Sequence, residues 1–148
     1  MKQTEIYLGL GSNLGDRHTL LLQTIERLVQ RVGPLVRCSS FVENQPWGFA
    51  SEHPFLNAVA LMQTTLTPRQ LLETTQQIER ELGRTEKTAA APDGTLAYHD
   101  RPIDIDILLY GDLTVDEPDL KIPHPRMAER PFVMGPLREV QTPVGRVF

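Results

Sequence analysis

Two aspartates, Asp104 and Asp106, stand one residue apart in a run of isoleucine and leucine. On a β-strand successive side chains point to opposite faces, so both carboxylates share one face while Ile103, Ile105 and Ile107 share the other. Two like charges so close together are unfavourable unless a cation or a strong donor lies between them. Oxygen ligands of this kind suit Mg²⁺, which is usually shared with substrate phosphates. Taken alone, the pair fits a magnesium site and a solvated polar face of an edge strand about equally well, and the neighbouring residues decide between them.

Basic side chains flank this pair along the sequence, as a polyphosphate ligand would require. Arg101 lies just before the aspartates, and Arg84 begins the long segment that leads to them. Downstream, the stretch from Lys121 to Arg130 holds a second basic cluster, in which His124 lies between two prolines. Each of these residues, taken singly, has an exposed structural position as its alternative. Together they indicate a surface that could neutralise a chain of phosphates.

Other polar and aromatic residues are candidates for ligand binding, each with an ordinary structural alternative. Gln76 and Glu79 are three residues apart in an expected helix and project from one face, which could equally be a hydrated surface. Asn57 is polar inside an apolar strand, where a buried amide needs partners such as the ring nitrogens and oxygens of a heterocycle. Three aromatic residues are also candidates for ligand binding, although aromatic residues by default belong to the core: Trp47, Phe55 and Phe132.

The familiar nucleotide-binding loops are missing from this sequence. The glycines from Gly9 to Gly15 have the wrong spacing for a dinucleotide fingerprint, because Gly15 follows Gly11 by four residues instead of three. There is also no G-x-x-x-x-G-K-[ST] motif. Any nucleotide site in this chain is therefore neither of the Rossmann nor of the Walker type.

The elements that must position these residues follow the order strand, helix, strand, strand, helix, strand. Apolar residues recur at helical spacing before Gly33 and again before Gly83, while the strand segments are bounded by turn formers. Thr67 followed by Pro68 is a typical helix start. The expected strands cover residues 6–10, 35–42, 55–65 and 103–110, and the expected helices lie between Asp16 and Gly33 and between Thr67 and Gly83.

Several segments outside this core order carry weaker patterns. Residues 84–101 have neither core periodicity nor strand character and predict a long mobile loop, which in a compact domain usually has a function. Gly111 and Asp112 predict a turn, and residues 113–115 the return strand of a hairpin. In the proline-rich tail we expect a short helix near residues 126–130 and a strand near residues 132–134.

This order predicts a ferredoxin-like α+β sandwich, with a mostly antiparallel sheet, helices on one face and additional C-terminal elements. The opposite face should then be free for ligands. No internal repeat, low-complexity tract or linker divides the 148 residues. We therefore expect a single domain over residues 1–148.

Composition narrows the function classes. The formal net charge is -4 and the sequence pI is about 5.5, so no overall attraction to nucleic acid or to an anionic membrane is expected. No apolar run is long enough to span a bilayer and no export signal opens the chain, which predicts a cytoplasmic protein. The single cysteine, Cys38, reads as a strand-filling residue. We expect a monomer or a weak dimer that binds small molecules.

Taken together and in order, these motifs resemble the 6-hydroxymethyl-7,8-dihydropterin pyrophosphokinase family of folate biosynthesis. Their co-occurrence is far more specific than any one of them, and the resemblance runs nearly end to end. The matching stretches are GLGSNLG (9–15), SSF (39–41), FLNA (55–58), QQIE (76–79), RxxDIDIL (101–108) and PHxxM (123–127).

The resemblance implies an enzyme that transfers pyrophosphate from ATP to the hydroxymethyl oxygen of the dihydropterin and releases AMP. It implies two Mg²⁺ ions held by Asp104 and Asp106, one on the α- and β-phosphates and one on the β- and γ-phosphates and the pterin hydroxyl. Arg84 and Arg101 match loop arginines that assist the transfer. Such catalysis works by positioning and charge neutralisation, with little covalent work for the protein.

Further positions match residues with which the family contacts its two substrates, and the segment 84–101 matches its mobile lid. Phe55 and Phe132 are implied as a pair that stacks on the pterin ring. The positions implied for ATP are Gln76, Glu79, Arg84, Arg101, Ile107, Lys121, His124 and Arg130. Those implied for the pterin are Gly11, Asn44, Gln45, Trp47, Phe55, Asn57 and Phe132.

The chain departs from the family pattern at three places. Residues 97–100 stand where many members have a basic residue and Trp-Gly-Pro, and the lid is longer. Asn44 and Gln45 replace a common Thr-Pro pair, and Pro125 stands after His124 where some members have tyrosine. These differences concern the lid and ligand affinity rather than the reaction.

Two alternative functions share parts of this pattern. RNA-recognition domains have the same topology, but they need stacking aromatics on the central strands and a basic surface, whereas Asp104 and Asp106 would repel a phosphate backbone. A kinase that transfers only the γ-phosphate to a small hydroxylated metabolite is the second alternative. The residues alone do not distinguish attack at the β-phosphorus from attack at the γ-phosphorus.

Overall fold

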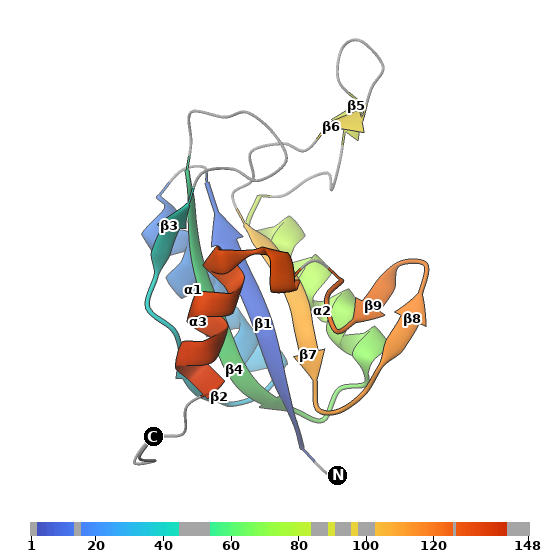
Figure 1. The fold of residues 1–148 in the computed structure, drawn as a ribbon. Coiled ribbons are helices and arrows are strands. Elements are labelled where there is room, and N and C mark those ends of the chain that lie inside the picture. The colour runs from blue at the N-terminus through green and yellow to red at the C-terminus, as the bar shows by residue number, and fades with distance from the viewer. Residues whose placement is uncertain are drawn as a thin grey trace.

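An antiparallel sheet is the centre of the structure, which is a computed structural model. The structure describes residues 3–13, 16–44, 54–83, 89–90, 96–97, 103–125 and 127–141. Figure 1 shows α1 (Arg17–Arg31) and α2 (Pro68–Glu81) on one face of this sheet and α3 (Pro131–Gln141) on the other. The elements are β1 (Thr4–Ser12), α1 (Arg17–Arg31), β2 (Leu35–Cys38), β3 (Val42–Asn44), β4 (Phe55–Thr64), α2 (Pro68–Glu81), β5 (Ala89–Ala90), β6 (Leu96–Ala97), β7 (Asp104–Tyr110), β8 (Val115–Glu117), β9 (Leu120–Ile122), the 3-10 helix η1 (Met127–Glu129) and α3 (Pro131–Gln141).

The sheet has the strand order β2-β4-β1-β7, and β3 also pairs with β4. Every pairing in it is antiparallel, and β1 lies in the middle with β4 on one side and β7 on the other. This order, with α1 after β1 and α2 after β4, is that of a ferredoxin-like sandwich. The fold class predicted from the sequence is confirmed.

The two helices between sheet strands begin at polar caps. The carboxylate of Asp16 accepts a hydrogen bond from the Thr19 amide at 3.1 Å, which lowers the pKa of Asp16 below its usual value. Thr67 and Gln70 form a reciprocal capping box at the start of α2, with Pro68 in the first turn. Among the described residues, no helix is long and apolar enough to cross a membrane.

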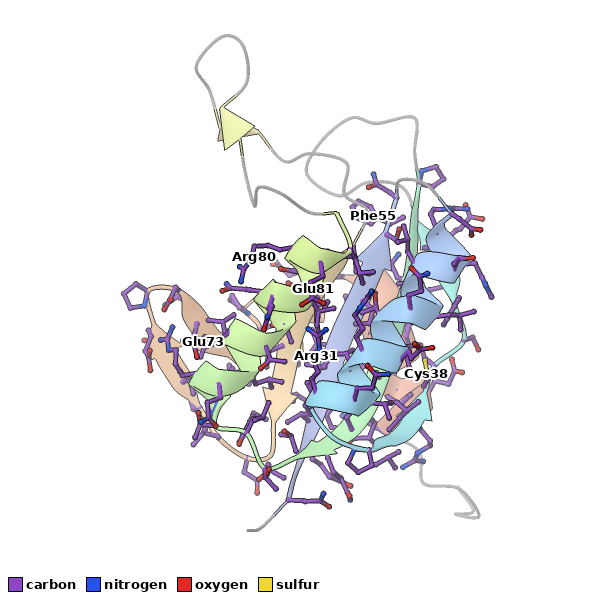
Figure 2. The ribbon with its side chains drawn as sticks, turned by 180° about the vertical axis from the view of Figure 1, so that it is seen from behind. Arg31, Cys38, Phe55, Glu73, Arg80 and Glu81 are labelled. Carbon is purple, nitrogen blue, oxygen red and sulfur yellow. The ribbon has the colours of Figure 1, made fainter. Side chains whose placement is uncertain are left out.

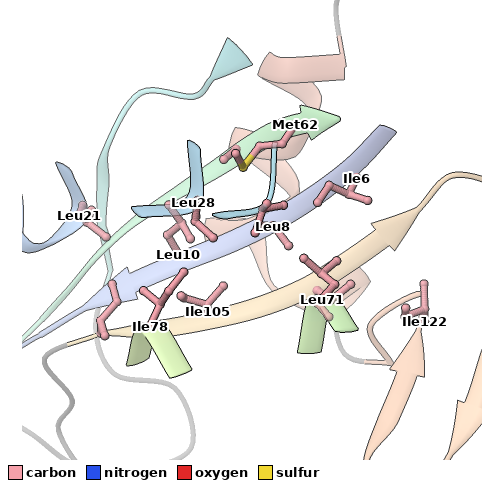
Figure 3. Packing of buried hydrophobic residues seen from close by; sticks show 14 of the residues in the cluster. Ile6, Leu8, Leu10, Leu21, Leu28, Met62, Leu71, Ile78, Ile105 and Ile122 are labelled. Carbon is pink, nitrogen blue, oxygen red and sulfur yellow. The ribbon is translucent and has the colours of Figure 1, made fainter. Parts of the chain in front are cut away.

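The main core lies between the sheet and the first two helices. Ile6, Leu8 and Leu10 of β1 point toward it and are at most 3% exposed. Figure 3 shows Leu28 of α1 and Ile78 of α2 packed against this row. Outside the core, Arg31 of α1 donates two hydrogen bonds to Glu81 of α2 at 2.8 and 2.6 Å, and these lower the pKa of Glu81 (Figure 2).

The expected second strand, residues 35–42, is in fact two strands, β2 and β3. Ser39 explains the interruption, because its amide donates to the Val59 carbonyl while its hydroxyl accepts from the Val59 amide at 2.8 Å. A side-chain oxygen thus replaces a main-chain acceptor at this point of the ladder. Burial raises the pKa of the Cys38 thiol at the end of β2, in agreement with a strand-filling role.

The predicted hairpin between β7 and residues 113–115 is wrong. The chain does turn at Gly111, but β8 pairs with β9 instead of returning along β7. The outer edge of β7 already has partners: Glu79 accepts from the Ile105 amide, and the His124 amide donates to the Leu108 carbonyl. Arg69 of α2 in turn binds two carboxylates of the β8–β9 hairpin, those of Glu117 and Asp119.

The strand expected near residues 132–134 is also wrong, because this segment is helical in α3. Val133, Leu137 and Val140 recur at helical spacing and are buried against Val59 and Leu108 of the sheet. Gly135 and Pro136 disguise this period in the sequence. The face opposite α1 and α2 is therefore only partly open, contrary to the sequence-based expectation. The short helix expected near residues 126–130 is present as η1.

Gly33 provides a sharp test of the packing between α1 and the sheet. Its φ is +153°, and an added Cβ would lie 1.9 Å from the carbonyl oxygen of Gln63. Gly33→Ala should therefore lower the free energy of unfolding by more than about 1 kcal/mol. Urea denaturation monitored by circular dichroism measures this loss.

Gly135→Ala is the matched control for the same substitution. Nothing lies within 4 Å of a Cβ added there, and Gly135 is within helix α3. Alanine should be neutral or should stabilise the protein by up to about 1 kcal/mol. Equal effects of the two substitutions would contradict the conformation assigned to Gly33.

Candidate functional site

Asp104 and Asp106 lie on the face of β7 that points away from the main core. Ile105 and Ile107 are buried on the core side, whereas both aspartates are half-buried. The alternation predicted from the sequence is confirmed. In the sheet register, Asp104 is opposite Gly11 of β1 and Asp106 is opposite Gly9. The two carboxylates therefore have no side chain directly across from them on β1.

Gly11 connects the aspartates to the next strand. It pairs with Asp104 on one side and with Asn57 of β4 on the other. A Cβ at Gly11 would lie 3.1 Å from the amide oxygen of Asn57 and 3.3 Å from the ring of Phe55. Three positions that the sequence associated with the pterin thus lie together: Gly11 is directly opposite Asp104, and Asn57 and Phe55 lie on β4, on the other side of β1.

Asn57 is almost completely buried, with 7% of its surface exposed. Its amide nitrogen lies 3.4 Å from the carbonyl oxygens of both Val42 and Phe55. These long contacts hold the amide plane across the β3–β4 pairing, and they point the amide oxygen toward Gly11. The side chain is therefore a fixed polar group on an otherwise apolar strand.

On the side of β7 that faces away from β1, the site is bounded by α2 and by the segment after β9. Glu79 of α2 is 4% exposed and accepts the Ile105 amide at 2.7 Å. The main-chain amide of His124 donates to the Leu108 carbonyl at 3.0 Å. The imidazole Nε2 of His124 lies 3.9 Å from Oδ1 of Asp106. His124 and Glu79 are thus both brought to the strand that carries the aspartates.

The remaining described candidates occupy different surroundings. Gln76 is half-buried on α2, one turn before Glu79. The Ile107 side chain is in the main core, so only its main chain can face a ligand. Lys121 forms an ion pair with Asp116 within the β8–β9 hairpin at 2.5 Å, and Arg130 is half-buried just before α3.

Other candidates lie outside the described residues: Arg84, Arg101, Gln45 and Trp47. The main chain of Asn44 ends β3 and that of Phe132 belongs to α3, but their side chains are also outside the description. Within the expected lid, 84–101, Ala89–Ala90 pairs with Leu96–Ala97. This corrects the expectation that the segment has no strand character, since strands of two residues are too short to give an alternating pattern in the sequence.

The donor set fits a hard divalent cation that is shared with a ligand. Two half-buried carboxylates project from one strand above glycines, and a histidine nitrogen lies near one of them. In the described part of the chain, no three His, Cys, Asp or Glu side chains form a closed metal cage. Mg²⁺ is commonly held by one or two carboxylates together with substrate phosphates, which is the arrangement this geometry can provide.

Gly9 belongs to the GLGSNLG motif but was not among the site residues predicted from the sequence. It pairs with Asp106 as Gly11 pairs with Asp104, and an added Cβ would meet the Leu108 side chain at 3.4 Å. A glycine inside a strand often marks the close approach of another group. The repeated spacing of Gly9, Gly11 and the two aspartates was the signal available in the sequence.

Solved structures define the class of fold to which this site belongs. The chain superposes on the Plasmodium falciparum HPPK-DHPS wild type with pteroate with a TM-score of 0.68 at 17% identity, over 93% of this chain. It spans 39% of the length of that longer protein. A likeness at this level of identity shows a common ferredoxin-like fold.

Sequence comparisons establish the family. Residues 7–142 match the family model described as 7,8-dihydro-6-hydroxymethylpterin-pyrophosphokinase (HPPK). A Porphyromonas gingivalis protein named 2-amino-4-hydroxy-6-hydroxymethyldihydropteridine pyrophosphokinase is 54% identical over 91% of this chain and 89% of its own length. A Bacillus subtilis protein of the same name is 43% identical over 90% of this chain and 76% of its own length. The chain belongs to the HPPK family.

Proposed function

We propose that this chain transfers the pyrophosphoryl group of ATP to the hydroxymethyl oxygen of 6-hydroxymethyl-7,8-dihydropterin, releasing AMP, in tetrahydrofolate biosynthesis. Membership of a pyrophosphokinase family supports the reaction. The observation that carries the proposal is the pair Asp104 and Asp106 on β7, opposite the glycines of β1, with Asn57 and Phe55 on β4 at the other side of β1. Phosphate-binding and heterocycle-binding groups thus lie side by side on one face of the sheet.

Asp104 and Asp106 would hold Mg²⁺, with two ions expected in the complex with ATP. Bound Mg²⁺ neutralises phosphate charge and supports displacement at phosphorus. The two carboxylates project from a strand whose backbone is held on both sides, so their separation is set before ligands arrive.

The reaction requires an in-line displacement at the β-phosphorus of ATP. The hydroxymethyl oxygen forms a bond to this phosphorus, the bond from phosphorus to the oxygen shared with the α-phosphate breaks so that AMP leaves with that oxygen, and the hydroxyl proton passes to solvent. His124, held by its main chain at Leu108 and near Asp106, is suited to donate a hydrogen bond to a phosphate oxygen. The ATP positions proposed with it are Gln76, Glu79, Arg84, Arg101, the main chain of Ile107, Lys121 and Arg130.

For the pterin, Asn57 is suited to pair with the hydrogen-bonding edge of the heterocycle, since its amide is buried and held in place. Phe55 would stack on one face of the ring, with Phe132 as its proposed counterpart. Gly11 would form the floor between them. The other residues proposed to contact the pterin are Asn44, Gln45 and Trp47.

We further propose that residues 1–148 act as a single cytoplasmic domain, as a monomer or a weak dimer, and that segment 84–101 closes over both substrates. The net charge of -4 supports small-molecule rather than nucleic-acid or membrane partners. Closure of such a segment would exclude water and complete the charge neutralisation around the phosphates.

Nucleotide product analysis tests the proposed reaction. The protein is incubated with ATP, Mg²⁺ and 6-hydroxymethyl-7,8-dihydropterin, and the products are separated by ion-exchange chromatography. AMP should form only when the pterin is present. ADP as the pterin-dependent product would instead indicate transfer of the γ-phosphate, and no pterin-dependent product from folded protein would contradict both forms of transfer.

Replacement of one proposed metal ligand should abolish transfer without unfolding the protein. Asp106→Ala removes a half-buried carboxylate and relieves its repulsion with Asp104, so kcat should fall by at least about 100-fold while stability is kept. Asp112→Ala, which removes an exposed carboxylate in the turn after β7, is the matched control and should leave activity unchanged. Near-normal activity of Asp106→Ala at ordinary Mg²⁺ concentration would remove Asp106 from the site.

Substitution of Gly11 should impair the pterin more than ATP. A Cβ at this position would press on Asn57 and Phe55, and overpacking of this kind costs about 1–3 kcal/mol. Gly11→Ala should raise the KM for the pterin about tenfold or more, since 1.4 kcal/mol corresponds to tenfold. The KM for ATP should change much less.

Gly9→Ala is the comparison for this effect, because its added Cβ would make only an ordinary contact with Leu108. Its effect on the KM for the pterin should be smaller than that of Gly11→Ala. Steady-state kinetics with each substrate varied in turn measures both constants. Equal increases in both KM values for Gly11→Ala would argue against Gly11 as part of the pterin floor.

A further inference from the structure

We propose that Glu79 is a positioning residue, which holds the strand bearing Asp104 and Asp106 through a buried hydrogen bond to its backbone. Its carboxylate oxygen Oε2 accepts the Ile105 amide at 2.7 Å. Ile105 is the residue between the two aspartates, so this bond acts at the centre of the pair. The link to catalysis rests on the proposed function, whereas the link to the strand does not.

The position of β7 in the sheet explains why such a bond is needed. β7 is the last strand in the order β2-β4-β1-β7, so one of its edges has no strand partner in this sheet among the residues that the structure describes. Along an antiparallel strand, successive amides point alternately to the two sides. Because the Ile105 amide points outward to α2, the amides of Asp104 and Asp106 point toward β1, where Gly11 and Gly9 are their register partners.

The result is a strand that is held from both sides at three consecutive residues. On the inner side the glycines of β1 pair with the two aspartates, and on the outer side Glu79 takes the place of a strand neighbour for Ile105. Further along the same edge, the His124 amide donates to the Leu108 carbonyl at 3.0 Å. The backbone under the two carboxylates therefore has little freedom to shift or twist.

Burial makes the bond to Glu79 strong. The residue is 4% exposed, and its neighbours on the inner face of α2, Thr75 and Ile78, are also buried. A buried carboxylate is costly unless hydrogen bonds satisfy it, and a bond from an amide to a charged acceptor is stronger than a neutral one. Without Glu79 the Ile105 amide would have no acceptor in an interior where water has little access, which is unfavourable.

Two substitutions at Glu79 separate the effect of side-chain length from the effect of negative charge. Glu79→Gln keeps the length of the side chain and an acceptor oxygen but removes the charge. Glu79→Asp keeps the charge but shortens the side chain by one methylene, so it no longer spans the distance from α2 to β7. A positioning role predicts that Glu79→Gln is the milder variant. The ATP contact proposed above for Glu79, if it acts through the negative charge, predicts instead that Glu79→Asp is the milder one.

Amide hydrogen exchange in the ligand-free protein tests the bond directly. In ¹⁵N-edited spectra, the Ile105 amide should exchange at least about tenfold faster in Glu79→Ala and Glu79→Asp than in the wild type. The Leu8 and Leu10 amides of β1 serve as internal references and should be unchanged. Glu79→Gln should retain most of the protection of Ile105. Glu73→Ala, which removes an exposed carboxylate from the same helix (Figure 2), should match the wild type.

The functional arm measures the Mg²⁺ concentration that gives half-maximal AMP formation. This concentration should rise in Glu79→Asp by at least about fivefold and much less in Glu79→Gln. Unchanged exchange of Ile105 in a folded Glu79→Asp variant, or a Glu79→Gln variant more impaired than Glu79→Asp, would overturn the proposal. If the wild type forms no pterin-dependent AMP, the proposed reaction fails, but the exchange measurements still decide whether Glu79 holds the strand.

Discussion

The pairing of β1 with β4 on one side and with β7 on the other is the constraint on which the structure depends. One face of β1 carries Ile6, Leu8 and Leu10 into the main core, and this fixes which face of each neighbouring strand is buried. The other face carries Gly9 and Gly11 at the same register as the two aspartates. A shift of one residue would bury both carboxylates, so the hydrophobic core and the candidate site are set by one register.

The outer edge of β7 is the second feature that shapes the molecule. An unpaired edge in a sheet invites further strand pairing. Here Glu79 and the segment after β9 occupy it, which sends the chain into a separate β8–β9 hairpin and brings His124 to Asp106. The same contacts that protect the edge thus assemble the polar groups around the carboxylates.

The far face of the sheet is divided between packing and ligand binding. Helix α3 covers Val59, Leu61 and Leu108, and Glu139 of α3 accepts hydrogen bonds from the amide and hydroxyl of Ser40 at 2.8 and 2.7 Å. The positions nearer the start of β7, around Gly11 and Asp104, lie beyond this covered part. A face that is apolar at one end and polar at the other can hold a helix and still present a site.

The sequence by itself determined the order of the main elements, the alternation of Asp104 and Asp106 with buried isoleucines, and the family. These are local signals, because periods of two and of 3.6 residues and helix caps act within one element. Tertiary structure decided the remainder: the division of the strand at Ser39, the pairing of β8 with β9, the helical state of α3 and the burial of Glu79 against Ile105. Each of these depends on contacts between residues far apart in the chain, whose free energies outweigh local preference. In α3 a helical period is present, but Gly135 and Pro136 obscure it, and the other three leave no periodic pattern in the sequence.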